Sequence, residues 1–468
     1  AHILGEAAPD VIHEAQVIKA LNQPLYKLHS VTHAYPTYAQ ALVGRASQLA
    51  YLDRMGSNFF VRKALGLLPG CANRLNLARE RLAETQQTTY GVKPAGPDVI
   101  IETETCGDGK ACVIVLPTDL MDHDEAPILA ALADGSKGLQ HIILNFFSVR
   151  RINGLGASML VKLSAYARRK GQRLSAFGVV QGLREVLRVT GLDQAIQIYD
   201  TKTKALSAAS VVAGQASLES PLESSVVVDT RYWAKPVMKL KATHRPKEAR
   251  SLNVHGRRAV GPVNGFGQLW QKIYRLHIGD PAIAPEQAVA ALKQNFPAFQ
   301  PWYNRFFPSP AGIQPGEIVL FDSLTPGGPV SAGVMVVYAD ERSFTFITPQ
   351  GHPECGMVSF SSYEAGGGTI AEILGLARAS DPVYEGGLRI IGSKVQVRIW
   401  THVLTSLAAY LGVPAHITAE STCVDSQTRW SQIGNIWRNA QIRTLLHEPI
   451  WWLAAPWRGR SGKRADSA

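Results

Sequence analysis

The spacing of apolar and polar residues changes twice along the chain and predicts three blocks of different structure. In residues 1–85, apolar positions such as Val11 and Ile18 recur at helical spacing, which predicts mostly helix. Residues 97–205 alternate strand-like and helix-like segments. Residues 227–415 carry strand-like segments with apolar residues at every second position, followed by a long amphipathic helix. The pattern therefore predicts a multidomain chain with α/β and α+β parts.

The middle block predicts strands joined by helices that are long enough to act as crossover connections. A crossover connection brings two strands into parallel pairing, so we expect a mixed, mainly parallel sheet. The predicted strands cover residues 111–121, 139–147, 172–180 and 195–200, and the predicted helices cover 124–138, 156–171 and 181–192.

The third block predicts a different kind of sheet, because its strands follow one another with short turns such as "ADER" between them. The predicted strands cover residues 316–324, 331–340, 343–351, 356–365 and 369–380, and the helix covers 394–413. We expect a curved antiparallel sheet that grips this helix. For the tail, residues 416–468, we expect more helix and a basic end rich in tryptophan.

Two segments rich in Gly, Pro, Ala and Ser separate the blocks, and they read as linkers. The first covers residues 86–98 and the second covers 206–226. A chain of 468 residues is too long for one typical core, so two to four domains are expected.

No apolar run reaches the length of a transmembrane helix, and the N-terminal residues lack a secretory signal pattern. The five cysteines are few and scattered, which suits a reducing compartment. Cys106 and Cys112 flank a predicted hairpin turn and are expected to face each other across two strands as free thiols. We therefore expect a cytoplasmic protein.

The formal net charge of +11 raises the question of nucleic acid binding. The basic residues are spread along the chain, with clusters at 231–258 and 458–464, and no nucleic-acid-binding motif accompanies them. A solvated basic linker is the favoured interpretation, with no nucleic acid partner. The tail combines three tryptophans with four basic residues. It either rests on an anionic membrane surface or packs its Trp451 and Trp452 on the third block.

The first block, through "AHILGEAAPDVIHE" and "VTHAYPTYAQAL", resembles the end of the dimerisation domain of pyridine nucleotide-disulfide oxidoreductases of the mercuric-reductase-like kind. The resemblance implies a His-Pro-Thr-x-x-Glu acid–base motif and a homodimer formed through this block. Here Tyr35 and Gln40 replace the histidine and the glutamate, and His33 stands two residues earlier. No Gly-x-Gly-x-x-Gly turn occurs in the chain. FAD and NAD(P) are therefore expected only if further domains lie upstream.

The middle block, through "HIILNFFSVRRINGLGASML" and "GQRLSAFGVVQGLREVLRVTGLDQAIQIYD", resembles the STAS domain of anti-sigma factor antagonists. In that family a hydroxyl in the turn before the helix is phosphorylated by a kinase that doubles as anti-sigma factor. The matching turn reads Arg151, Ile152, Asn153, Gly154, Leu155 and Gly156. Ile152 occupies the phosphoacceptor position and has no hydroxyl, so phosphorylation cannot switch this loop.

Two interpretations of this loop remain open. It is either a retained surface for a protein partner, in which case the resemblance implies a kinase-type anti-sigma factor, or a turn kept for structure alone. Two glycines after a buried strand also permit close packing of strand and helix.

The third block, through residues 326–364 and the helix after them, resembles the START-like helix-grip superfamily, also called SRPBCC. The resemblance implies an apolar ligand held between sheet and helix. Strand alternation would put His352 and Glu354 on one face, as a metal pair or an acid–base pair. The alternative is a plain turn, and no metal is expected because a third ligand with suitable spacing is missing. His402 is expected to be a half-buried core histidine.

Three functions follow from these interpretations. The favoured one is a non-catalytic regulatory protein, in which a STAS-like domain without a phosphorylatable serine is fused to an apolar-ligand-binding domain. The alternative is the C-terminal part of a flavin-dependent disulfide oxidoreductase whose cofactor domains lie upstream. The third is a ligand carrier whose other blocks are adaptors.

Overall fold

The computed structural model describes the larger part of the second and third blocks. The described residues are 100–106, 109–121, 132–133, 138–209, 228–242, 246, 249, 253–325, 327–387 and 393–453. They all belong to one compact unit, residues 94–468, which is separate from residues 1–93. Our expectations for the first block lie outside the described residues. The same is true of most of the 206–226 linker, most of the predicted helix at 124–138, and the basic end of the tail.

The middle block forms a five-stranded sheet in the order β1-β2-β4-β6-β7. Its strands are β1 (Ile100–Cys106), β2 (Gly109–Val115), β4 (His141–Asn145), β6 (Arg173–Phe177) and β7 (Gln197–Ile198). All neighbouring strands are parallel except β1 and β2, which form an antiparallel hairpin. A mainly parallel mixed sheet was predicted, and the pairing confirms it.

Two of the three described helices of this block lie within a few residues of the predicted ranges, and the last one was not predicted. The three helices are α6 (Gly154–Arg169), α7 (Gln181–Thr190) and α8 (Lys202–Ala209), with a short 3-10 turn, η2 (Leu192–Gln194), after α7. Helix α7 ends at Gly191, whose φ of 75° is readily adopted only by glycine. A short parallel pair, β3 (Asp119–Leu120) with β5 (Arg151–Ile152), leads into α6.

One expectation about this block is wrong. Cys106 and Cys112 do not lie opposite each other in the β1–β2 hairpin. The register pairs Cys106 with Gly109 and Cys112 with Thr103, because the turn between the strands is only two residues long. The hairpin register therefore gives no support to a cysteine pair.

The third block is built on a large antiparallel sheet in the order β10-β11-β12-β13-β14-β15-β9-β16, with β8 paired to β13. Its strands are β8 (Ala259–Val260), β9 (Leu269–Ile278), β10 (Asn304–Phe307), β11 (Ile318–Thr325), β12 (Gly328–Ala339), β13 (Ser343–Pro349), β14 (Glu354–Ala365), β15 (Gly368–Ala379) and β16 (His416–Asp425). The five strands predicted from alternation are β11 to β15.

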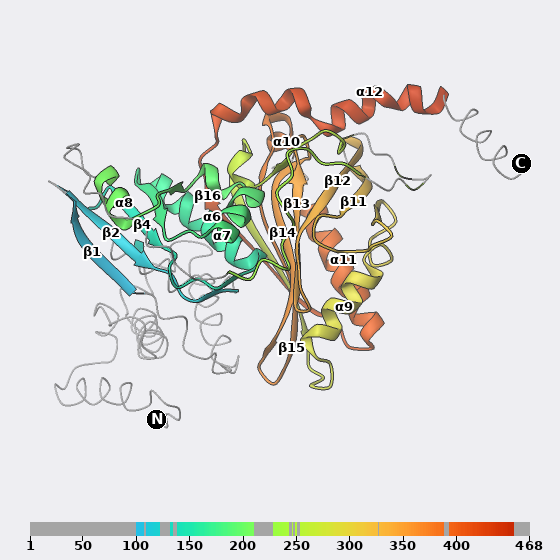
Figure 1. Cartoon of the computed structure of the whole chain (residues 1–468). Coiled ribbons are helices and arrows are strands. Elements are labelled where there is room, and N and C mark those ends of the chain that lie inside the picture. The colour runs from blue at the N-terminus through green and yellow to red at the C-terminus, as the bar shows by residue number, and fades with distance from the viewer. Residues whose placement is uncertain are drawn as a thin grey trace, which may run out of the picture. The chain divides into compact units, whose positions relative to one another are not determined.

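The helix that was predicted to be gripped by this sheet is α11 (Ser393–Leu411). It packs with α9 (Pro285–Asn295) on one face of the sheet, as Figure 1 shows. Apolar side chains of α11, including Val403, Leu404 and Leu407, are fully buried in the core there, together with a group of phenylalanines from the sheet. The core on this face therefore lies between the antiparallel sheet and the two helices.

A second core cluster joins the middle block to the other face of the large sheet. It contains residues of α6 and α7 together with residues of β9, β12, β14 and β15. Figure 1 shows α6 and α7 on the side of the sheet opposite α11. The boundaries that we drew at residues 205, 226 and 415 stay predictions.

The tail, for which more helix was expected, begins with a strand that was not predicted. Residues 416–425 form β16, which pairs with β9 along its length. This strand lies at an edge of the sheet and most of its side chains are exposed, so it lacks the apolar alternation of a half-buried strand. Helical structure follows in the 3-10 segment η5 (Trp430–Arg438) and in α12 (Ala440–Leu453). The short η3 (Pro262–Asn264) and α10 (Pro382–Gly387) complete the described helices.

Candidate functional site

A cavity of about 610 Å³ lies between the large sheet and α11. This volume lies within the range that small-molecule sites usually occupy. Its lining is mostly apolar and aromatic: Trp270, Phe306, Phe321, Val330, Val334, Phe346, Met357, Val358, Ala377, Val383, Tyr384, Val395, Ile399, Trp400, Ile442 and Leu445 are among the residues that face it. A cavity of this composition is suited to an apolar guest.

Strand β14 supplies several residues to the cavity lining. Glu354, Gly356 and Val358 stand at every second position and line it, and Met357 lines it as well. Gly356 also keeps the neighbouring strand close, because a Cβ there would fall 2.4 Å from the Cβ of Ala377 on β15. The sheet face below α11 is thus shaped by residue size as well as by polarity.

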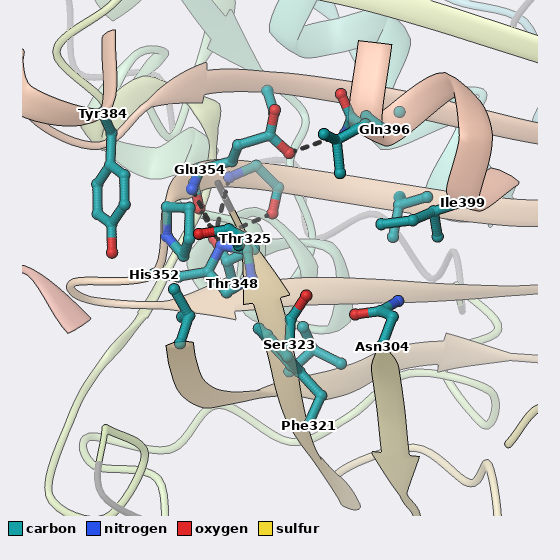
Figure 2. A pocket seen from close by; sticks show the side chains of 18 of the residues that line it. Asn304, Phe321, Ser323, Thr325, Thr348, His352, Glu354, Tyr384, Gln396 and Ile399 are labelled. Atoms are coloured by element: carbon teal, nitrogen blue, oxygen red, sulfur yellow. Dashed lines mark hydrogen bonds between the residues drawn. The ribbon is translucent and has the colours of Figure 1, made fainter. Parts of the chain in front are cut away.

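A chain of three polar side chains interrupts the apolar lining. Gln396 on α11 donates a hydrogen bond from Nε2 to Oε2 of Glu354 at 2.9 Å. Lys272 on β9 donates from Nζ to Oε1 of the same glutamine. Figure 2 shows Gln396 directed toward Glu354. The cavity therefore has one end where a carboxyl, an amide and an ammonium group are linked.

The surroundings of Glu354 change its acidity. Burial raises the pKa of the Glu354 carboxyl, while Lys272 and the hydrogen bond from Gln396 oppose that rise. The carboxyl group therefore holds its proton to a higher pH than an ordinary glutamate does. A protonated carboxyl donates a hydrogen bond, and an ionised one accepts, so this group can meet either kind of partner.

His352 lies beside Glu354, in the turn before β14. Its Nδ1 lies 3.0 Å from the backbone nitrogen of Glu354 and 2.8 Å from its carbonyl oxygen, so either ring tautomer finds a backbone partner. Its ring contacts the edge of Phe321 with the centroids 5.4 Å apart. Burial lowers the pKa of the imidazole to about 4. His352 is therefore neutral at pH 7.

His352 lies in a turn, as the alternative interpretation had it, and its ring meets the backbone of Glu354, so strand alternation does not apply to the two residues. An acid–base role for the pair stays a prediction. Residues 351–353 form the turn, and β14 begins at Glu354. Within the described part of the chain, no group of three or more potential metal ligands comes together.

The structure also adds two residues that the sequence did not point to. Lys272 lies on a strand that we did not predict, and Gln396 is separated from Glu354 by 42 positions.

The expectation for His402 is wrong. It lies exposed on α11 and does not line the cavity, because the neighbouring Val403 and Leu404 occupy the buried face of the helix. Tyr35, Gln40 and His33 lie outside the described residues.

The loop of residues 151–156 lies mostly in the interior. Ile152 is 1 % exposed, and its carbonyl oxygen accepts a hydrogen bond of 2.8 Å from the indole Nε1 of Trp233. Asn153 is buried and caps α6: its Oδ1 accepts from the backbone nitrogens of Leu155 and Gly156 at 3.0 Å. These contacts hold the loop from both sides.

The first glycine of the loop lies against the large sheet. A Cβ at Gly154 would fall 1.8 Å from Oγ1 of Thr345 on β13. Arg151, by contrast, is exposed and forms an ion pair with Asp119 at 2.5 Å. Docking of an external partner on residues 151–156 stays a prediction. An external partner would have to separate α6 from the sheet to reach more than Arg151.

No helix among the described residues has the length and apolar character needed to cross a membrane. The cavity under α11 is lined by His352 and Glu354, the pair singled out in the sequence, and is a candidate functional site of the described chain.

No protein-family model matches the sequence, and no curated protein is significantly similar to it. Solved structures match parts of the chain. The di-domain ARO/CYC StfQ from the steffimycin biosynthetic pathway is 12% identical over 31% of this chain, with a TM-score of 0.25, and the matched region spans about half (53%) of StfQ. Protein Ms6760 from Mycobacterium smegmatis is 15% identical over 31% of this chain and 93% of its own, with a TM-score of 0.24. An anti-sigma factor antagonist from Thermotoga maritima is 20% identical over 23% of this chain and 93% of its own, with a TM-score of 0.20.

Proposed function

We propose that the chain is a non-catalytic regulatory protein that binds a small apolar molecule carrying one hydroxyl or amino group. The observation that carries the proposal is the cavity of about 610 Å³ under α11, apolar over most of its lining and polar where Glu354, Gln396 and Lys272 meet. The apolar lining supplies affinity through burial, and the polar end supplies orientation.

The regulatory part of the proposal rests on a shared sheet. Glu354 on β14 lines the cavity. The neighbouring strand β13 contains Thr345, against which Gly154 of α6 packs. Thr345 and Ser359 hydrogen bond through their hydroxyl groups at 2.9 Å, which ties the two strands on the side that faces α6. A ligand that shifts β14 therefore acts on the STAS-like block through one layer of packed side chains.

The test is a cavity-filling substitution with a matched control on the same helix. Ile399 lines the cavity, whereas Val397 is 40% exposed and does not line it. Ile399→Trp should lower the affinity for Nile red, an uncharged apolar probe, at least about tenfold, which corresponds to about 1.4 kcal/mol. Val397→Trp should leave the affinity unchanged. Equal affinities for the two variants, or no uptake of the probe by the unchanged protein, would contradict the proposal.

The polar end has its own test. Glu354→Gln keeps the size of the side chain and removes its charge, so it should weaken the binding of long-chain amines. The binding of alkanes of equal length should not change. The affinities of the amines and of the alkanes are measured by their competition with bound Nile red.

A second proposed function is binding of a kinase-type anti-sigma factor, favoured by the position of residues 151–156 between a strand and a helix. Arg151 is the exposed member of this loop, so Arg151→Glu should weaken the complex. Arg169→Glu, at the far end of α6, is the control. Equal binding of the two variants in a titration would remove this function. The disulfide oxidoreductase alternative rests on residues outside the described chain and stays a prediction.

A further inference from the structure

A second cavity, of about 580 Å³, shares no lining residue with the first. It lies where α7 and η2 of the middle block meet η3, η5 and the β8 region of the third block. Its lining includes three arginines and a single acidic residue: Arg188, Arg258, Arg438 and Asp193. The first cavity is mostly apolar, whereas this one is rich in polar and cationic groups.

We propose that this second cavity binds a small organic phosphate. Arg188, Arg258 and Arg438 are exposed to solvent, and none forms an ion pair or a side-chain hydrogen bond with another described residue. Asp193 lines the same cavity and interacts electrostatically with Arg188, so three guanidinium groups face one carboxylate and the described lining has an excess of positive charge. A multiply charged anion balances this excess and accepts hydrogen bonds in pairs, because the guanidinium fork matches the oxygens of a phosphate.

A fourth arginine near the cavity supports an anionic ligand independently. Arg257 is half-buried, and its Nη2 is buried without a hydrogen-bond partner. Burial, together with the charges of Arg443 and Arg438, lowers the pKa of Arg257 to about 10. Positive charge thus accumulates beside Arg438 without a described counter-ion. Arg257 does not line the cavity, so an anion at Arg438 acts on it through charge alone, by offsetting part of this positive charge.

The remaining lining suits the rest of an organic phosphate. Gln350 and Gln432 are half-buried, and their side-chain amides form no hydrogen bond with described residues, so they are available to a ligand. Val237 and Met238 are 50% and 87% exposed and supply an apolar wall. The volume far exceeds that of inorganic phosphate and lies in the range of small-molecule sites. We therefore infer a ligand with both a phosphate group and an organic part, of about the size of a nucleotide.

The site belongs to two blocks of the chain at once. Arg188 comes from α7, whereas Arg258 and Arg438 come from the third block. Near them, Asn264 donates a hydrogen bond of 2.8 Å from Nδ2 to Oε1 of Gln194, so the two blocks already touch beside the cavity. A ligand held by arginines from both blocks binds only when they are docked, and it therefore stabilises the docked arrangement.

The experiment is isothermal titration of the full chain with ATP, AMP, inorganic phosphate and citrate at fixed low ionic strength. We expect ATP and AMP to bind more tightly than inorganic phosphate, and to raise the melting temperature. Arg258→Gln and Arg438→Gln should each weaken ATP binding about tenfold or more, the usual effect of losing a hydrogen bond to a charged group. Arg398→Gln is the matched control: this arginine is exposed on α11, lies outside the cavity, and its loss changes the net charge equally.

Three results would overturn the proposal. The first is no binding of either nucleotide. The second is equal weakening in the control, which would mean non-specific attraction to a basic protein. The third is binding of citrate as tight as that of ATP, which would remove the assignment to phosphate. Nile red binding reports the first cavity and is expected to be unchanged in these variants, so the two proposals fail separately.

Discussion

At the scale of single residues, two glycines decide how closely α6 approaches its neighbours. A Cβ at Gly156 would fall 2.0 Å from the carbonyl oxygen of Leu120, and backbone cannot move aside as a flexible side chain can. We expect Gly156→Ala to lower the free energy of unfolding by about 2–3 kcal/mol, as overpacking in a core usually does. Urea unfolding measures the change. Gly279→Ala, where no atom lies within 4 Å of the added Cβ, is the control, and an equal loss there would contradict the contact argument.

His352 makes the stability of the fold depend on pH. Its pKa is lowered to about 4 in the folded protein, from an ordinary value of 6.5. Between these two pH values the unfolded chain therefore binds more protons than the folded protein does. The contribution of His352 is therefore complete above about pH 6.5 and is lost as the pH falls toward about 4. We expect His352→Gln to remove a stability decrease on the order of 2 kcal/mol over that window.

The measurement is a series of urea unfolding curves between pH 4 and pH 7. His402→Gln, at an exposed histidine outside the cavity, should keep the slope of the unchanged protein. Glu354 acts in the opposite sense, since its raised pKa makes stability fall as the pH rises above its unfolded value. For this reason the comparison between the two histidine variants, and not the total slope, isolates His352.

At the scale of elements, the beginning of α6 depends on one side chain. Asn153 caps the helix through Oδ1 and also donates from Nδ2 to the carbonyl oxygen of Met121 at 2.6 Å. Asn153→Ala should cost about 2 kcal/mol, because it removes the cap and the hydrogen bond to the partly buried carbonyl of Met121. Asn153→Ser, which restores an acceptor at the cap, should recover part of the loss in thermal unfolding. Identical losses in both variants would contradict a capping role.

The elements that could be predicted from the sequence are those whose own pattern is strong. Strands β11 to β15 alternate clearly or form apolar runs, and α11 has one apolar face. Strand β16 was missed because most of its side chains are exposed at an edge of the sheet, so no local pattern marks it. Strand β9 was not predicted because Lys272 and Arg275 interrupt its apolar positions. Both side chains form hydrogen bonds with partners that are far away in the sequence.

The same difference applies to the candidate site. His352 and Glu354 are close because they are two residues apart, with His352 in the turn before β14 and Glu354 at its start. Lys272 and Gln396 complete the polar end, but they are 124 positions apart and meet only when α11 packs on the sheet. No spacing rule within one element contains that information. The arginines of the second cavity could not be predicted from local spacing either, because they come from separate elements in two blocks.

At the scale of the whole described unit, the middle and third blocks share a core. Residues of α6 belong to the same apolar cluster as residues of β9, β12 and β14, and Lys162 of α6 donates to Gln271 of β9 at 2.5 Å. We expect the amide hydrogens of α6 and β13 to exchange through one common opening, with equal free energies in hydrogen exchange followed by mass spectrometry. If the free energy of opening is lower for α6 than for β13 by more than about 2 kcal/mol, the blocks open independently.

The carboxyl of Glu354 has a consequence for how the cavity exchanges with the solution. A guest that brings an ammonium group to this end favours the ionised carboxylate, and in the range below its raised pKa it must expel the proton that Glu354 holds. Uptake of such a guest is then coupled to acidification of the medium, and its affinity rises with pH. A guest that brings a hydrogen-bond acceptor favours the protonated carboxyl, so its affinity falls with pH. One buried acid thus makes the same cavity select different guests in acidic and in alkaline surroundings.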